Sequence, residues 1–211
     1  MNYIQKVYFH KQILDGIILV HETIHSLKST KSSGMMLKLD ISKAYDKLNL
    51  CFLAEMLKAF GFHAHWVEWV LNLVSSMFFS ILVNVTPAQP FASCRGIRQG
   101  DPLSPFLFII IAEGLGRMLT TIRSNNKIKG LTLCEGMRPQ THKQFVDDTM
   151  LLGPGSVTKS RGIKTGLNTF LEASGLEINN EKFQVYFNTP SITRRNILRI
   201  LGFSEGHLPS K

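Results

Sequence analysis

The sequence predicts an α+β fold, in which an antiparallel sheet carries helices on one face, of the split βαβ (ferredoxin-like) kind. The main observation is the order of its segments, which runs strand, helices, hairpin, helix, hairpin, helix, strand. The length of 211 residues suits one well-cored domain. The hydrophobic content of 44% is ordinary for a folded protein and argues against disorder.

The first half of the chain is predicted from apolar spacing and from capping residues. Asn49 is expected to cap a helix that Gly61 stops, and Gly34 to Ile41 is a strand that ends near Asp40. The predicted elements are a helix over 11–27, a strand over 34–41, helices over 49–60 and 64–77, and β structure over 79–85 before a turn at 86–90.

The second half begins with a loop over 95–105 that is rich in Gly and Pro. Ser104 followed by Pro105 has the order that opens a helix, and the apolar run behind it predicts that this helix is long and buried. The remaining predictions are a strand over 127–134, a hairpin over 143–152, a helix over 158–174 that ends at Gly175, a loop and strand over 176–187, and a last helix over 191–201.

Two adjacent carboxylates, Asp147 and Asp148, lie in an otherwise apolar stretch of the predicted hairpin. Adjacent buried carboxylates repel each other and are costly to desolvate unless a cation offsets their charge. The pair therefore indicates a metal site, although an acidic surface turn is the commoner fate of two neighbouring aspartates. Asp40, at the end of its strand, is a candidate third ligand, and carboxylate oxygens suit Mg²⁺.

The formal charge of +9 favours a polyanionic partner, of which nucleic acid is the commonest for a basic domain. An anionic membrane would also attract this charge, but no basic amphipathic helix supports it. The longest apolar run, 106–112, is too short to span a bilayer, and the N-terminus lacks a secretory pattern. Three scattered cysteines fit free thiols. We expect an intracellular protein, nuclear or cytoplasmic, neither secreted nor transmembrane.

Four motifs, in order, resemble the palm of reverse transcriptases from non-LTR, LINE-like retrotransposons, especially those of plants. The resemblance covers nearly the whole chain from about Phe9, and it implies the fold of a polymerase palm. The motifs are Leu39-Asp-Ile-Ser-Lys-Ala-Tyr-Asp46, Arg95-Gly-Ile-Arg-Gln-Gly-Asp-Pro-Leu-Ser-Pro105, Phe145-Val-Asp-Asp148 and Ser174-Gly-Leu-Glu-Ile-Asn-Asn-Glu-Lys182.

The resemblance implies RNA-directed DNA polymerase activity, with an RNA template, a DNA primer and dNTPs as partners. Asp40, Asp147 and Asp148 would be catalytic and hold two Mg²⁺ ions, for which Mn²⁺ is a possible substitute. Such ions lie roughly 3.5–4 Å apart and clamp the attacking and leaving oxygens of phosphoryl transfer. Lys182 would lie near the pyrophosphate as a general acid, although a solvated surface lysine is the alternative.

Other positions would contact the nucleotide or the template. Tyr45 would be the steric gate that favours deoxynucleotides, with a core aromatic as the alternative, and Ile41 would line the nucleotide site beside it. Gln99 and Gly100 would border the incoming nucleotide and the template base. Arg95 and Arg98 would contact template phosphate, or else serve as structural ion-pair partners.

We expect residues 1–33 to be a remnant of the fingers and palm-entry helix, and 34–211 to be the palm. The fingers would be incomplete and the thumb absent. In the family, the same polyprotein normally supplies both. Weak or absent primer extension by the chain alone is therefore expected. The alternative is a catalytically inactive retrotransposon-derived fragment that at most binds nucleic acid. A two-metal nuclease or cyclase is disfavoured, because such enzymes have no reason to carry the 95–105 motif.

Overall fold

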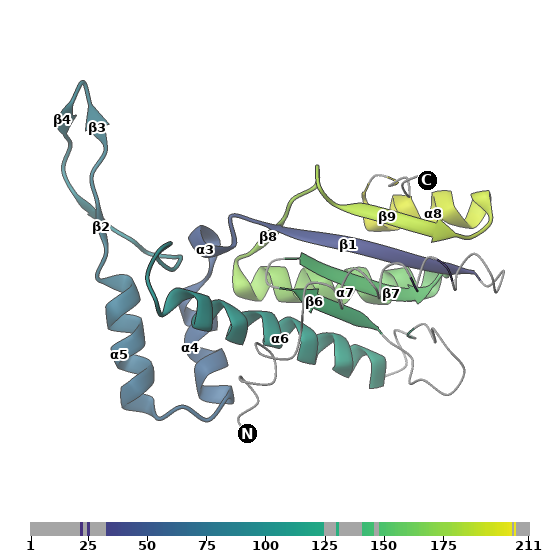
Figure 1. Cartoon of the computed structure of the whole chain (residues 1–211), viewed down its shortest axis with the longest axis horizontal. Coiled ribbons are helices and arrows are strands. Elements are labelled where there is room, and N and C mark those ends of the chain that lie inside the picture. The colour runs from purple at the N-terminus through teal and green to yellow at the C-terminus, as the bar shows by residue number, and fades with distance from the viewer. Residues whose placement is uncertain are drawn as a thin grey trace. The chain divides into compact units, whose positions relative to one another are not determined.

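The computed structural model describes residues 33–124, 141–145 and 148–203, together with Glu22, His25, Gly130 and Glu205. These residues divide into two compact units (Figure 1). The sheet unit holds the described residues of Met1–Asp40, Gly116–Asn168 and Ile178–Lys211, and the helical unit holds Ile41–Leu115 and Thr169–Glu177. Of the predicted helix over 11–27 only Glu22 and His25 are described, both as helical, and the predicted strand over 127–134 lies outside the described residues. The predicted domain boundary at residue 33 stays a prediction.

Five strands form one sheet whose centre is β1 (Gly34–Ser42). The order is β6-β7-β1-β8, and β9 also pairs with β1. The β1–β7, β1–β9 and β6–β7 pairs are antiparallel, as predicted. The other strands are β6 (His142–Phe145), β7 (Asp148–Pro154), β8 (Glu177–Ile178) and β9 (Gln184–Asn188). The predicted strand over 34–41, the hairpin over 143–152 and the strand within 176–187 are therefore confirmed.

Helices α7 (Val157–Ser174) and α8 (Ser191–Leu201) lie behind the sheet in Figure 1. Met35, Leu37 and Leu39 are buried, and the hydroxyl of Ser160 on α7 donates to the Met35 sulfur at 3.4 Å. Successive side chains of a strand point to opposite faces, so Asp40 belongs to the face turned away from α7. This arrangement fits the predicted antiparallel sheet with helices on one face.

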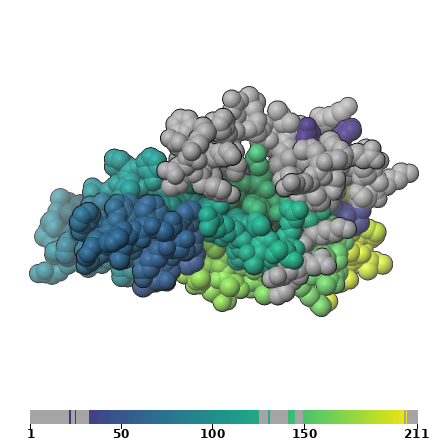
Figure 2. Space-filling model, turned by 90° about the horizontal axis from the view of Figure 1, so that it is seen from below, coloured from purple at the N-terminus to yellow at the C-terminus, as the bar shows by residue number. Residues whose placement is uncertain are grey.

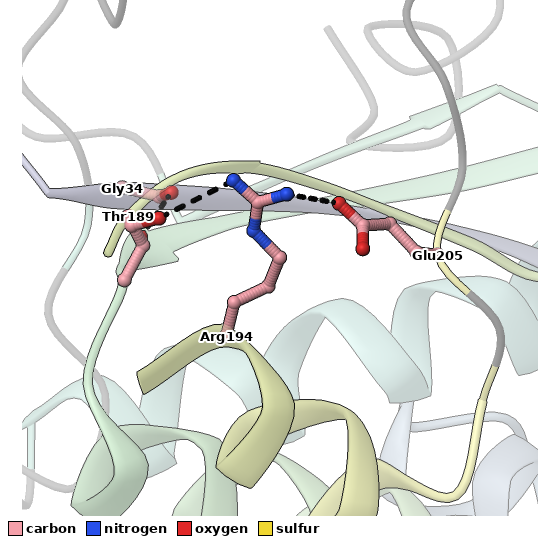
Figure 3. Close-up of polar contacts among 4 residues, drawn as sticks. All are labelled: Gly34, Thr189, Arg194 and Glu205. Carbon is pink, nitrogen blue, oxygen red and sulfur yellow. Dashed lines mark hydrogen bonds and ion pairs between the residues drawn. The ribbon is translucent and has the colours of Figure 1, made fainter. Parts of the chain in front are cut away.

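A polar network fixes the start of α8 to the first residues of β1 (Figure 3). Arg194 donates to Glu205 Oε1 at 2.7 Å and to the Thr189 carbonyl at 3.5 Å. The Thr189 hydroxyl in turn donates to the Gly34 carbonyl at 3.1 Å. The two terminal nitrogens of Arg194 thus join the start of α8 to the segment around β1, whereas its buried Nε has no hydrogen-bond partner within the described chain.

The helical unit contains α3 (Ala44–Lys47), α4 (Leu50–Ala59) and α5 (Ala64–Ser75), the last two packed side by side in Figure 2. The predicted caps are confirmed. The Asn49 side chain accepts from the backbone N–H of Cys51 at 2.8 Å and of Phe52 at 3.4 Å. Gly61 ends α4 with a φ of 84°, a conformation that costs glycine little.

A narrow ribbon follows α5, and here the predicted turn at 86–90 is wrong. Thr86–Pro87 form β4, which pairs with β3 (Leu82–Val83), and the chain reverses at Asn84 and Val85. Both have positive φ, which a β-branched valine rarely adopts, so Val85 did not indicate a turn at this position. Lower on the ribbon, β2 (Phe78–Phe79) pairs with β5 (Phe91–Ala92).

Helix α6 (Ser104–Ser124) begins at the predicted Ser104-Pro105 pair. Among the described residues it is the one helix that is long and apolar enough to cross a membrane, judged by length and composition. The core helix of a soluble protein meets the same test, and Leu107, Phe108 and Ile111 of α6 are buried. The expectation that the chain does not engage a membrane stays a prediction.

Candidate active site

The first part of the candidate site lies where the last residues of β1 pair with the first residue of β7. Their register places Asp40 directly opposite Asp148, which begins β7. Two of the three predicted ligands are thus brought together by strand pairing, although they are far apart in sequence. Asp147 lies outside the described residues.

Lys182 is brought to Asp40 by the turn that precedes β9. The backbone N–H of Asn179 donates to the Asp40 carbonyl at 2.9 Å, and Lys182 N–H donates to the Asn179 carbonyl at 3.2 Å. The Lys182 ammonium then lies 3.7 Å from Asp40 Oδ2. Its side chain is 68% exposed, whereas that of Asp40 is 15% exposed. Lys182 is therefore a mostly exposed lysine that lies beside the Asp40 carboxylate, and its role as a general acid stays a prediction.

Phe183, the next residue, explains how this turn is anchored. It is fully buried and stacks on Phe203 with ring centroids 3.6 Å apart. Burying an aromatic ring of this size contributes a few kcal/mol. The buried ring fixes the backbone from which Lys182 projects, a role that the motif alone did not indicate.

Tyr45 lies on α3, in the helical unit, and Ile41 follows Asp40 directly along β1. The Tyr45 ring stacks on Phe108 of α6, with centroids 5.3 Å apart and planes 21° apart. Lys43 precedes α3 with a φ of 46°, which turns the chain from the strand into this short helix. The ring is half-buried, so part of it packs in the core and part stays accessible.

The loop between β5 and α6 is fastened to α3 by its backbone. Ile97 N–H donates to the Tyr45 carbonyl at 2.7 Å, and Gly96 N–H donates to the Leu48 carbonyl at 2.8 Å. The Gln99 amide donates to Asp46 Oδ1 at 3.4 Å. These bonds bring Tyr45 and Gln99, two predicted nucleotide contacts, onto adjoining segments. Gly100 beside them is exposed, with a φ of 85° that favours glycine.

Asp46 and Asp101, the other acidic residues of the motifs, have local structural roles. Asp46 accepts from Gln99, and Asp101 Oδ1 accepts from the backbone N–H of Leu103 at 2.8 Å, just before α6.

A groove of about 1020 Å³ lies between this loop, the end of α5 and the ribbon, and Arg95, Arg98 and Gln99 line it. Both arginines are exposed, and neither forms an ion pair with a carboxylate of the described chain. The structure thus favours their role as cations open to a ligand over that of structural ion-pair partners.

Ser104 is a lining residue that sequence reasoning treated only as a helix start. It is 1% exposed, and within the described chain its hydroxyl has no hydrogen-bond partner. A buried hydroxyl without a partner costs about 1–3 kcal/mol, and Ser104 stands at the N-terminus of a 21-residue helix, where anions are stabilised. Its position after two arginines was the sequence signal for an anion site.

The carboxylates fit a divalent metal by their chemistry. Asp40 offers a hard oxygen donor at a partly buried position opposite a second aspartate. Within the part of the chain that the structure describes, no three His, Cys, Asp or Glu side chains form a metal-binding group. That finding does not bear on the predicted cluster, which includes Asp147.

Comparisons with known proteins agree with these residues. Residues 4–204 match the family model described as reverse transcriptase (RNA-dependent DNA polymerase). An uncharacterized 149 kDa protein of transposon TX1 from Xenopus laevis is 27% identical over 82% of the chain and 13% of its own length. A Pol polyprotein of the retrotransposable element R2DM from Drosophila melanogaster is 30% identical over 75% of the chain and 14% of its own length. The chain thus spans about one seventh of these relatives.

Solved structures with a similar fold include telomerases. One from Candida albicans, in complex with a fragment of telomeric RNA, has a TM-score of 0.60 and 15% identity, over 84% of this chain and 30% of its own. An apo telomerase from Candida tropicalis has a TM-score of 0.58 and 15% identity, over 84% of this chain and 35% of its own. At such low identity the likeness shows the fold alone, and it supports the predicted α+β polymerase architecture.

Proposed function

Because the chain belongs to the reverse transcriptase (RNA-dependent DNA polymerase) family, with retrotransposon Pol proteins among its relatives, we propose that it carries the nucleotidyl-transfer centre of such an enzyme. The observation that supports this most strongly is the pairing of Asp40 with Asp148 across β1 and β7. The proposed partners are an RNA template, a DNA primer and dNTPs, and the proposed location is nuclear or cytoplasmic.

Asp40, Asp147 and Asp148 are the proposed ligands of two Mg²⁺ ions, with Mn²⁺ as a substitute. When bound, the metal lowers the pKa of the primer 3′-hydroxyl and neutralises charge on the departing pyrophosphate. The 3′-oxygen forms a bond to the α-phosphorus of the dNTP, and the bond from that phosphorus to the pyrophosphate breaks. Lys182, 3.7 Å from Asp40, donates a proton to the departing pyrophosphate.

Arg95 and Arg98 are the proposed contacts to template phosphate, and Ser104 adds a hydroxyl donor in the same groove. Gln99, Gly100 and Ile41 are the proposed contacts to the nucleotide and the template base. The exposed arginines, which have no ion-pair partner among the described residues, support this assignment, since a groove lined by cations attracts a polyanion.

Tyr45 is the proposed steric gate, and its removal gives a specificity prediction. Tyr45→Ala is expected to lower the preference for dATP over ATP by about tenfold to 200-fold, the range for a change in pocket fit. Equilibrium binding of the two nucleotides to the chain, with Mg²⁺ and a primer–template, measures this ratio. Phe52→Ala serves as a control, because the Phe52 ring meets Phe170 edge to face and is not part of the Tyr45–Phe108 pair. An unchanged ratio in Tyr45→Ala would show that the ring is only a core aromatic.

The proposed function is tested by primer extension on an RNA template with Mg²⁺, comparing the chain with Asp147→Ala. We expect extension by the chain alone to be weak, to depend on the metal and to be lost in the variant, because the substitution removes a ligand. Binding of Mn²⁺, followed by its electron paramagnetic resonance, is measured in parallel. Metal binding without extension would support the alternative of a catalytically inactive fragment. Equal Mn²⁺ binding by both proteins would contradict the assignment of Asp147.

A further inference from the structure

Helices α7 and α8 carry most of the excess positive charge of the chain. They contain six basic residues and one acidic residue, so they hold five of the nine excess charges. The acidic residue, Glu172, lies near the end of α7, and α8 has none. The basic residues are Lys159, Arg161 and Lys164 on α7 and Arg194, Arg195 and Arg199 on α8.

Two of these six basic side chains make contacts that stabilise the fold. Lys164 donates to the Ile200 carbonyl at 2.6 Å, which joins α7 to the end of α8. Arg194 is held by Glu205 and by the Thr189 carbonyl, as Figure 3 shows. These contacts place the basic parts of the two helices side by side within the sheet unit.

Three others have no comparable structural task. Arg161, Arg195 and Arg199 are exposed, and within the described chain none has a hydrogen-bond or ion-pair partner. Arg195 and Arg199 are four residues apart on one helix and therefore neighbours, and like charges at this spacing destabilise a helix by about 0.2–0.5 kcal/mol. No acidic residue of α8 offsets this repulsion, but a bound polyanion would.

The surface is separate from the candidate active site. The hydroxyl of Ser160 on α7 contacts Met35, whereas Asp40, five residues further along β1, belongs to the opposite face of the sheet. The nucleotides that react at the carboxylates therefore cannot be the ones that contact the outer face of α7 and α8.

We propose that Arg161, Arg195 and Arg199 form a second nucleic-acid surface, which binds the phosphodiester backbone of a single-stranded segment outside the reacting region. Arginine donates in a fork that matches phosphate oxygens, and such binding is independent of sequence. The surface would raise the affinity of the domain for its RNA without contributing to the chemical step.

The test is the salt dependence of RNA binding by the full chain, measured by fluorescence anisotropy with an unstructured single-stranded RNA. Each phosphate contact on a single strand contributes about 0.7 to the slope of log K against log salt. The triple variant Arg161→Ala/Arg195→Ala/Arg199→Ala is expected to lower the slope by about two and to weaken binding at about 50 mM salt by roughly tenfold or more. The exposed positions leave the buried core intact, so the circular dichroism spectrum is expected to stay unchanged.

Matched variants separate this surface from the others. The triple Arg→Lys variant keeps the charge and should retain most of the slope, while Lys58→Ala on α4 removes one exposed charge outside the two helices and should change it little. Arg95→Ala/Arg98→Ala should add its own loss to that of the triple alanine variant. An unchanged slope in the triple alanine variant would overturn the proposal. The proposal would also be overturned if the triple alanine variant lost binding to phosphatidylserine vesicles but kept its RNA binding, because the occupant would then be a membrane.

Discussion

Asp40→Asn is expected to reduce Mg²⁺-dependent primer extension by about 10³-fold, equivalent to about 4 kcal/mol of transition-state stabilisation. The substitution keeps the size of the side chain but removes the negative charge that a divalent ion requires. Mn²⁺ affinity, measured by electron paramagnetic resonance, should fall by more than the roughly tenfold to 100-fold that loss of an outer-shell partner costs. The metal measurement is informative even when the chain extends no primer.

The variant is expected to fold normally. The Asp40 carbonyl, not the carboxylate, accepts the hydrogen bond from Asn179. The carboxylate lies 3.7 Å from the ammonium of Lys182, and this ion pair contributes little because the lysine is mostly exposed. Glu55→Gln is the matched control, since it makes the same charge change on the surface of α4, where Glu55 pairs with Lys58. Equal Mn²⁺ affinities in Asp40→Asn and Glu55→Gln would remove Asp40 from the site.

Gly96→Ala is expected to lower the free energy of unfolding by about 4 kcal/mol, because it adds strain and a steric clash. Gly96 has a φ of 86°, and a Cβ there would lie 2.7 Å from the Asp46 carbonyl oxygen and 2.8 Å from that of Tyr45. Both neighbours are backbone, so they cannot rotate away. Urea unfolding, monitored by circular dichroism, measures the change.

Gly100→Ala is the control for Gly96→Ala. Gly100 has nearly the same φ, 85°, but a Cβ there would meet nothing within 4 Å. Gly100→Ala should therefore lower the free energy of unfolding only by the conformational strain, about 1–2 kcal/mol. The difference between the two variants isolates the packing of the loop against α3. Equal costs would show that this close contact does not stabilise the helical unit.

Much of the fold followed from local signals. The caps at Asn49 and Gly61, the Ser104-Pro105 helix start and the apolar strand at 34–41 are all confirmed, because each depends on a few neighbouring residues. The reversal at Asn84–Val85 was missed because Val85 adopts a positive φ against its intrinsic preference. Such a conformation depends on the pairing of β3 with β4, which no local pattern reports.

The motifs also anticipated the family, which the match over residues 4–204 confirms, while the plant affinity stays a prediction. They did not indicate that Phe183 anchors the Lys182 turn, or that Ser104 has a buried hydroxyl without a partner in the described chain. The first depends on Phe203, which lies twenty residues further along the chain, and the second on how the folded chain buries the start of α6.

The sequence by itself determined which residues can do chemistry, namely adjacent carboxylates in an apolar stretch, a Gly- and Pro-rich loop with arginines, and an excess of positive charge. Only the tertiary structure decided which of them meet. Strand pairing set Asp40 opposite Asp148, and backbone hydrogen bonds joined the 95–105 loop to Tyr45. The contact between α7 and α8 brought their basic residues together. The physical reason is that side-chain chemistry is a property of single residues, whereas register and packing arise from the whole folded chain.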